Sequence, residues 1–147
     1  MCMPNFSRTV TVSSDIDSAF EFLSDFRNLE KWAEGDEGEL ITKEPLRQGS
    51  VFRVNTHFNN KPRQYNYEII EWGPPLRVSL QASTSIFTIV DTIFLSANSK
   101  GTEVTYSVDI NYKFPFFIIG IFVGTIFNKI MDKQIRNLEA VLGPVQE

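Results

Sequence analysis

Residues Thr102 to Tyr112 alternate polar and apolar side chains without interruption. A period of two is typical of a β-strand with one face in solvent and the other in the core. The chain then carries no charge from Phe114 to Phe127, and an apolar pattern continues to Leu142. Pro115 before this segment and Gly143-Pro144 after it are the residues expected at the two ends of a helix. The pattern therefore predicts a strand followed by one long helix over Pro115 to Leu142.

The preceding chain predicts further strands and a short helical region. Phe6 to Val12 alternates like a strand, and Ser13, Ser14 or Asp15 can then cap a helix. Its apolar stripe is Ile16, Ala19, Phe20, Leu23 and Phe26, and a second helical turn is expected over Leu29 to Trp32. The other predicted strands are Leu40 to Lys43, Ser50 to Phe58, Arg63 to Trp72, Leu76 to Ala82 and Ile86 to Ser96.

The links between these strands are short and rich in turn-forming residues, which predicts antiparallel neighbours. The expected fold class is α+β, with an antiparallel sheet of about seven strands. At 1.5 Å per residue the terminal helix is roughly 42 Å long. It is the only element long enough to cover the apolar face of the sheet, so we expect the sheet to wrap around it.

Composition narrows the functional classes. The chain has 147 residues, of which 42% are hydrophobic, and its net charge is −4. This suits a single domain over residues 1–147, and no basic stripe favours nucleic acid as a partner. Cys2 and His57 are the only residues of their types, so neither an internal disulfide nor a Cys/His metal cluster is expected. We therefore predict a cytoplasmic protein without a cofactor or a bound metal.

Charge is unevenly distributed along the chain. Residues 15–44 contain ten acidic and three basic residues, a net charge of −7, so the remainder carries +3. The acidic segment Glu34 to Glu39 lacks the alternating oxygen ligands of a calcium loop, so it is predicted to be a solvated loop. Lys113, Lys129 and Lys133 lie near or on the terminal helix.

Three motifs in order along the chain resemble one protein family. Val10-Thr11-Val12 runs into a helix and on to Trp32, and a later segment from Glu68 to Arg77 contains Pro74-Pro75. The third motif is Gly101-Thr102-Glu103-Val104-Thr105-Tyr106. Together they resemble the SRPBCC, or START-like, helix-grip superfamily, and most of all its polyketide cyclase/dehydrase-like branch. The resemblance implies a curved sheet around the terminal helix and a largely apolar cavity that holds lipids, hormones, polyketides or similar molecules.

The fold implied by this resemblance serves carriers and enzymes alike, so the site must decide the function. The leading hypothesis is binding of a hydrophobic small molecule or lipid between sheet and helix. The first alternative is a cyclase or dehydratase in which Asp91 or Tyr106 transfers protons, and the second is a membrane-associated or assembly factor. The residues expected to line the cavity are Trp32, Phe52, Val54, Tyr65, Tyr67, Val90, Tyr106, Val108, Phe122 and Ile126.

The orientation of Asp91 is ambiguous in the sequence. Its strand can bury either the set that includes Val90 or the set that includes Ile89 and Ile93, and only the second carries Asp91 inward. In that case burial would raise the pKa of Asp91 unless a cation such as Arg8 compensates. His57 is predicted to point outward, because it alternates with Phe52 and Val54.

Apolar residues from Phe116 to Phe127 surround the predicted helix on all sides, so its first half needs cover on a second side. Neighbouring loops, a second copy in a homodimer, or a membrane surface could supply that cover. The segment is shorter than the roughly 20 residues that cross a bilayer. Gly120 and Gly124 have the spacing of close helix packing, and we expect them to serve packing, ligand access or dimerisation.

Overall fold

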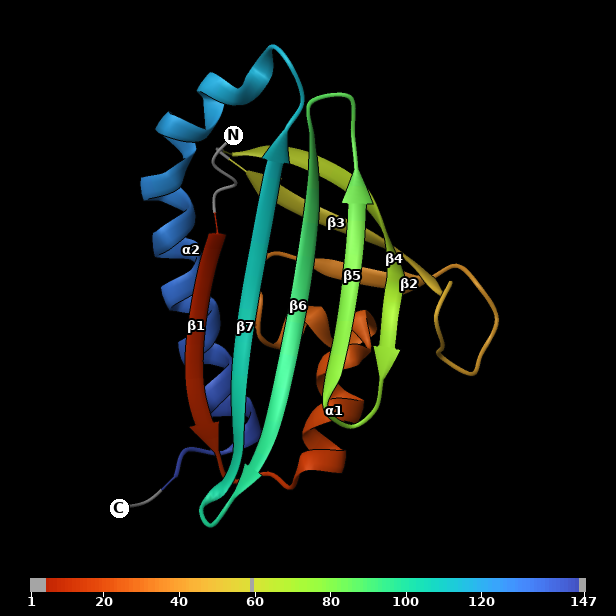
Figure 1. Ribbon diagram of the computed structural model, residues 1–147, viewed down its shortest axis with the longest axis vertical. Coiled ribbons are helices and arrows are strands. Elements are labelled where there is room, and N and C mark those ends of the chain that lie inside the picture. The colour runs from red at the N-terminus through yellow and green to blue at the C-terminus, as the bar shows by residue number, and fades with distance from the viewer. Residues whose placement is uncertain (1–4, 59, 146–147) are drawn as a thin grey trace.

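The computed structural model describes residues 5–58 and 60–145, and Cys2 lies outside them. Seven strands form one antiparallel sheet in the order β1-β7-β6-β5-β4-β3-β2, which confirms the predicted fold class (Figure 1). The strands are β1 (Asn5–Val12), β2 (Glu37–Leu40), β3 (Val51–Phe58), β4 (Lys61–Gly73), β5 (Arg77–Ser83), β6 (Phe87–Asn98) and β7 (Gly101–Tyr112).

Two α-helices and two 3-10 helices complete the described chain: α1 (Ile16–Ser24), η1 (Phe26–Lys31), η2 (Phe116–Ile118) and α2 (Ile119–Leu142). Asp15 caps α1 by accepting a hydrogen bond from the backbone N–H of Ser18 at 3.2 Å. Helix α2 ends at Gly143, as predicted, but it begins four residues after Pro115. The turn predicted to open the helix is instead the separate 3-10 helix η2. It begins at Phe116, whose backbone N–H donates to the backbone oxygen of Lys113, three residues earlier.

The prediction of a strand over Leu40 to Lys43 was wrong, because β2 begins three residues earlier, at Glu37. Leu40 is its last residue, and Glu37 and Glu39 belong to the strand rather than to a loop. Gly38 explains this position, because a Cβ there would lie 1.9 Å from the backbone oxygen of Phe26. Only glycine lets the strand pass this close to η1. The acidic side chains are tolerated because β2 is an edge strand with a wet face.

The helices share the cover of the sheet. Helix α2 runs along β1 at one edge and reaches β7 and η1, whereas α1 contacts β6 and η1 contacts β2 (Figure 1). The terminal helix therefore does not cover the apolar face alone, which corrects the expectation from its length. Because α1 and η1 cover the rest, the interior is enclosed between the sheet, these two helices and α2.

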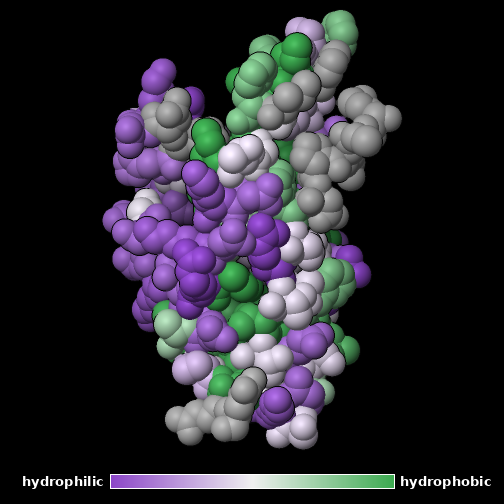
Figure 2. Space-filling view, turned by 90° about the vertical axis from the view of Figure 1, so that its left-hand side faces the viewer, coloured by the Kyte–Doolittle hydropathy of each residue, from purple (hydrophilic) through white to green (hydrophobic). Residues whose placement is uncertain are grey.

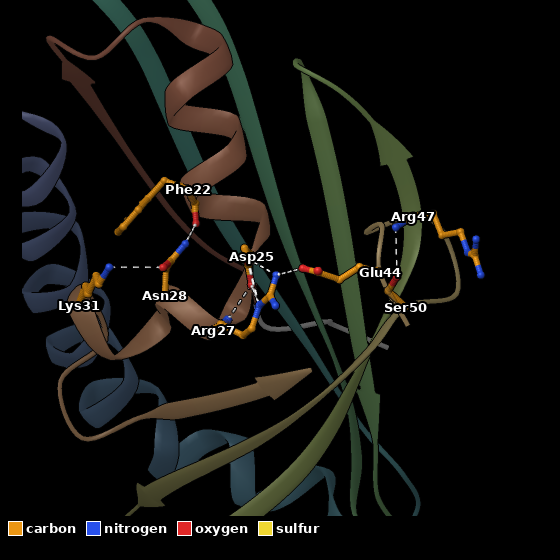
Figure 3. Close-up of polar contacts among 8 residues, drawn as sticks. All are labelled: Phe22, Asp25, Arg27, Asn28, Lys31, Glu44, Arg47 and Ser50. Atoms are coloured by element: carbon orange, nitrogen blue, oxygen red, sulfur yellow. Dashed lines mark hydrogen bonds and ion pairs between the residues drawn. The ribbon is translucent and has the colours of Figure 1, made fainter. Parts of the chain in front are cut away.

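Helix η1 is fixed to its surroundings by polar contacts (Figure 3). Arg27 donates to both carboxylate oxygens of Asp25, with Nε to Oδ1 at 2.9 Å and Nη2 to Oδ2 at 2.8 Å. Its Nη2 also donates to Glu44 at 2.7 Å, across to the loop between β2 and β3. Asn28 donates to the backbone oxygen of Phe22 at 3.1 Å. These contacts fix the first half of η1, and Trp32, whose side chain is buried, follows its last residue.

Candidate functional site

Asp91 points into the interior. Only 6% of its surface is exposed, and its neighbours two positions away, Ile89 and Ile93, are buried on the same face of β6. The register that places Asp91 opposite Val108 sets this face. Val90 consequently lies on the outer face, half-buried, so its expected place in the cavity lining is corrected.

The hydroxyl group of Tyr106 donates a hydrogen bond to Oδ2 of Asp91 at 2.9 Å, and both side chains are buried. Oδ1 of Asp91 accepts no hydrogen bond from the described residues. Burial raises the pKa of Asp91 to about 7, the hydrogen bond from Tyr106 lowers it, and the charge of Asp36 raises it. A carboxyl group with this pKa can both accept and give a proton at neutral pH.

Trp32 adds a second buried polar atom next to this pair. Its ring packs edge-on against the ring of Tyr106, with centroids 5.2 Å apart and an interplanar angle of 88°. Trp32 Nε1 is buried and donates to no described residue. Tyr106 therefore contacts both the side chain that holds an unpartnered acceptor and the side chain that holds an unpartnered donor. Such groups cost free energy in a protein interior unless a partner reaches them.

Arg8 does not compensate the charge of Asp91. It lies opposite Tyr106 in the β1–β7 register, but its side chain reaches α2. There Nε donates to Oδ1 of Asp132 at 2.7 Å, and Nη2 donates to Oδ1 of Asn128 at 3.0 Å. Arg8 thus joins β1 to α2, and among the described residues no cation compensates the charge of Asp91.

Asp36 is a second carboxyl group turned toward the interior, and sequence analysis placed it in a solvated loop. Burial raises its pKa to about 6, whereas a hydrogen bond from the hydroxyl of Thr56 and the nearby His57 lower it. Burial, followed by the negative charges of Asp91 and Asp36, raises the pKa of Tyr67 well above its usual range. No signal in the sequence distinguishes Asp36 from the acidic residues around it.

The structure brings several expected lining residues together. Phe52, Val54, Tyr67 and Val108 are buried on the inner face of the sheet, and Tyr65 is half-buried there, with its ring 5.8 Å from that of Phe87. His57 is exposed on the outer face, as predicted.

Phe122 and Ile126 do not join this group. They are 73% and 45% exposed, on the side of α2 that faces away from the buried Met131. Whether a helical residue points inward depends on how the helix is rotated about its axis. A segment that is apolar all around the helix does not reveal this rotation. The side chains of Phe58, Phe117 and Ile121 lie outside the described residues.

Gly120 and Gly124 lie on the inner side of α2, because helical spacing places them on the same side as Met131. A Cβ at Gly120 would lie 2.9 Å from Cε2 of Tyr112, so this position must be small to let α2 approach β7. A Cβ at Gly124 would have no atom within 4 Å. There is therefore open space beside α2, on the side that faces the sheet.

The surface is hollowed at the same end of the molecule. Figure 2 shows a notch at the top of the face over α2, between a hydrophilic arm and a hydrophobic arm. Two surface hollows of about 270 and 360 Å³ lie elsewhere, and neither includes Asp91 or Tyr106 in its lining.

Among the described residues, no group of three or more His, Cys, Asp and Glu side chains is placed to hold a metal ion. No described helix is long and apolar enough to cross a membrane.

Residues 3–143 match the family described as polyketide cyclase / dehydrase and lipid transport. A comparison with curated proteins gives no match. Several solved structures share the fold. A START superfamily protein from Mycobacterium smegmatis has a TM-score of 0.77 and 13% identity, over 94% of this chain and 96% of that one.

Two further solved structures extend the range of similar proteins. Ginseng major latex-like protein 151 from Panax ginseng has a TM-score of 0.72 and 17% identity, over 98% of this chain and 100% of that one. The di-domain ARO/CYC BexL from the BE-7585A biosynthetic pathway has a TM-score of 0.74 and 11% identity, over 99% of this chain and 51% of that one. This chain thus spans about half the length of BexL. At these identities the likeness concerns the fold alone.

Proposed function

Because the chain belongs to the polyketide cyclase / dehydrase and lipid transport family, we propose that it binds a hydrophobic small molecule or lipid between the sheet and α2. The apolar part of the ligand would contact the inner-face residues Phe52, Val54 and Val108. Its polar group would lie at Asp91, and its passage to solvent would lead past Gly124 toward the notch.

The observation that carries this proposal is the pair of unpartnered polar atoms in an apolar interior, Oδ1 of Asp91 and Nε1 of Trp32. Buried polar groups in folded proteins are nearly always hydrogen-bonded, so two exceptions in one interior support the proposal that a ligand binds there. An oxygen-bearing group of the ligand would accept a hydrogen bond from Nε1 of Trp32, and a ligand hydroxyl would donate one to Oδ1 of Asp91. We therefore propose a ligand with a long apolar part and a hydroxyl or similar oxygen-bearing group.

Two probes that differ in one hydroxyl group test the proposal. Displacement of the dye 1-anilinonaphthalene-8-sulfonate would be measured with 1-decanol and with n-decane. Decanol should bind about tenfold more tightly, because a net hydrogen bond contributes roughly 1 kcal/mol or more. The double variant Asp91→Leu/Tyr106→Phe removes both polar partners at similar volume and should lose this preference. The control variant Leu76→Ser, at an exposed side chain beside Leu95, itself four residues along β6 from Asp91, should keep it.

The open space beside Gly124 allows a second variant. Gly124→Leu should weaken binding of both probes, because its side chain would extend into that space. Gly120→Leu is not an equivalent test, because it would collide with Tyr112 whether or not a ligand binds. The proposal fails if the folded wild-type protein binds neither probe saturably, or if Gly124→Leu binds both as tightly as the wild type.

A second candidate function is that of a cyclase or dehydratase acting on a polyketide-like substrate. The observation that favours it is a buried carboxyl group with a pKa of about 7 and a hydroxyl donor at 2.9 Å. In a dehydration the carboxylate of Asp91 would take the proton from C2 of a 3-hydroxyacyl substrate. The hydroxyl group on C3 would leave, and the same proton would return to it to release water.

The test uses 3-hydroxydecanoyl N-acetylcysteamine thioester, whose dehydration product absorbs in the ultraviolet. Turnover should rise as the pH passes about 7, because the base form of Asp91 is required, and Asp91→Asn should abolish it. Turnover that persists in Asp91→Asn would exclude Asp91 as the base. An inactive wild-type protein that binds decanol would leave ligand binding as the function.

A further inference from the structure

Helix α2 carries exposed apolar side chains on the side that faces away from the sheet. Ile118 just before the helix, Phe122 and Ile126 are 57%, 73% and 45% exposed, and their spacing of four residues places them in one row. We call these three residues the outer stripe. Lys129 continues the row by one further turn, and it is exposed. Apolar groups that gather on a surface in this way mark a site of interaction.

The surrounding end of the molecule is basic. Three segments meet there, because the ring of Phe87 lies 5.8 Å from that of Tyr65 and 6.1 Å from that of Tyr112. Lys113 also donates to Ser83 at 3.0 Å. Residues 60–65, 83–88 and 111–131 contain no Asp or Glu, and we call these three segments the basic end. Its cationic residues are Lys61, Arg63, Lys113 and Lys129.

Negative charge is concentrated in residues 15–44, the acidic segment. Residues 15–44, which include α1, η1 and β2, carry a net charge of −7. The acidic segment borders the basic end, since Asp36 accepts a hydrogen bond from Thr56 and Glu37 pairs with Asn55. An anionic surface would attract the basic end and repel this segment. Apolar side chains flanked by Lys and Arg are the combination by which a helix lies in the interface of an anionic membrane.

We propose that the outer stripe and the basic end dock on the surface of a membrane that contains anionic lipids. Phe122 and its neighbours in the stripe would insert among the headgroups, while Lys61, Arg63, Lys113 and Lys129 would contact lipid phosphates and carboxylates. The notch in Figure 2, which opens at the same end, would then lie beside the lipid. That last step rests on the proposed function, whereas docking itself does not.

A second copy of the chain fits this surface less well than a membrane does. In a twofold dimer the same patch faces itself, so the basic ends of the two copies would meet with like charges. The glycine pair that could bring two helices together is also unavailable, since Gly120 packs against Tyr112 on the inner side of α2. The exposed stripe thus has the charge environment of a lipid-facing surface.

Co-sedimentation with vesicles tests the inference. The protein should bind vesicles of phosphatidylcholine mixed with phosphatidylserine and should bind pure phosphatidylcholine vesicles far less. Binding should weaken as salt is added, because salt screens the attraction to anionic headgroups. Phe122→Glu should reduce partitioning about tenfold or more, since it removes the aromatic side chain that would insert into the membrane and adds a negative charge. Phe122→Leu should retain most of the binding.

Two controls make the result specific. Leu76→Ser removes an apolar side chain that is 57% exposed and lies outside the basic end, and it should leave partitioning unchanged. Displacement of the fluorescent dye by decanol in solution should be the same for Phe122→Glu as for the wild type. This separates the two proposals: a protein that binds decanol but no vesicle overturns docking alone, and one that binds vesicles but no probe overturns ligand binding alone.

The oligomeric state is measured on the same samples. We expect a monomer by light scattering for both the wild type and Phe122→Glu. Docking is overturned if the wild type is a dimer that Phe122→Glu dissociates, because the stripe would then be the dimer interface. It is also overturned if Phe122→Glu and Leu76→Ser bind anionic vesicles equally well.

Discussion

Tyr106 reaches Asp91 diagonally across two paired strands. In the register of β6 and β7, Asp91 lies opposite Val108 and Tyr106 lies opposite Ile93, yet the hydroxyl of Tyr106 donates to the carboxylate at 2.9 Å. The length of the tyrosine side chain spans this offset of two residues. The buried carboxyl group therefore has one donor, from the neighbouring strand, and one oxygen to which no described residue donates a hydrogen bond.

The first prediction concerns stability and pH. Burial raises the pKa of Asp91 from 3.8 to about 7, so the folded protein holds a proton that the unfolded chain releases. Stability should therefore fall as the pH rises from about 4 to about 7 and level off above that range. The loss is on the order of 4 kcal/mol for a shift of this size. Urea denaturation of the wild type and Asp91→Asn across this range measures it.

The difference between these two proteins isolates Asp91 from the other carboxyl groups. Burial also raises the pKa of Asp36, to about 6. Asp36 therefore lowers stability between about pH 4 and 6, and it does so in both proteins. Asp91→Asn should be close to the wild type at pH 4 and more stable above pH 7. A difference that stays constant with pH would contradict a raised pKa at Asp91.

The second prediction concerns the donor. Tyr106→Phe leaves both oxygens of Asp91 without a partner and should cost about 1–3 kcal/mol of unfolding free energy. The cost should be greater at pH 8 than at pH 5, because a hydrogen bond to a carboxylate is stronger than one to a carboxylic acid. In the Asp91→Leu background the same substitution should cost much less. Equal costs in both backgrounds would show that the lost hydroxyl acts through another contact.

The sequence predicted an element correctly where its periodic pattern extended over many residues and one of its faces was exposed to solvent. The alternation from Thr102 to Tyr112 identified β7 within one residue, and Gly143 identified the end of α2. It was undecided at Asp91 because β6 has apolar side chains on both faces, so only the register with β7 settles the direction. The rotation of α2 was hidden for the same reason, and Phe122 and Ile126 were placed on the wrong side. The cytoplasmic location and the absence of a cofactor stay predictions.

The third prediction concerns the link between β1 and α2. Arg8 donates to Asp132 at 2.7 Å and to Asn128 at 3.0 Å, and its side chain is 27% exposed. Arg8→Met should cost roughly 1 kcal/mol of unfolding free energy, because partly exposed ion pairs contribute little. The cost should shrink when salt is added, in contrast to the loss of an apolar contact. Asp132→Asn, which keeps an oxygen acceptor, should cost less than Arg8→Met in the same denaturation experiment.

The last prediction compares two glycines on one side of α2. Alanine favours a helix over glycine by about 1 kcal/mol, so either substitution would stabilise the protein if space allowed. A Cβ at Gly124 meets no atom within 4 Å, and Gly124→Ala should therefore raise the melting temperature. A Cβ at Gly120 would come within 2.9 Å of the ring of Tyr112, so Gly120→Ala should lower it. Thermal denaturation measures both, and the variant Tyr112→Leu should remove the penalty at Gly120, because its side chain is shorter. A stabilising Gly120→Ala in the wild-type background would mean that α2 lies farther from β7 than the structure places it.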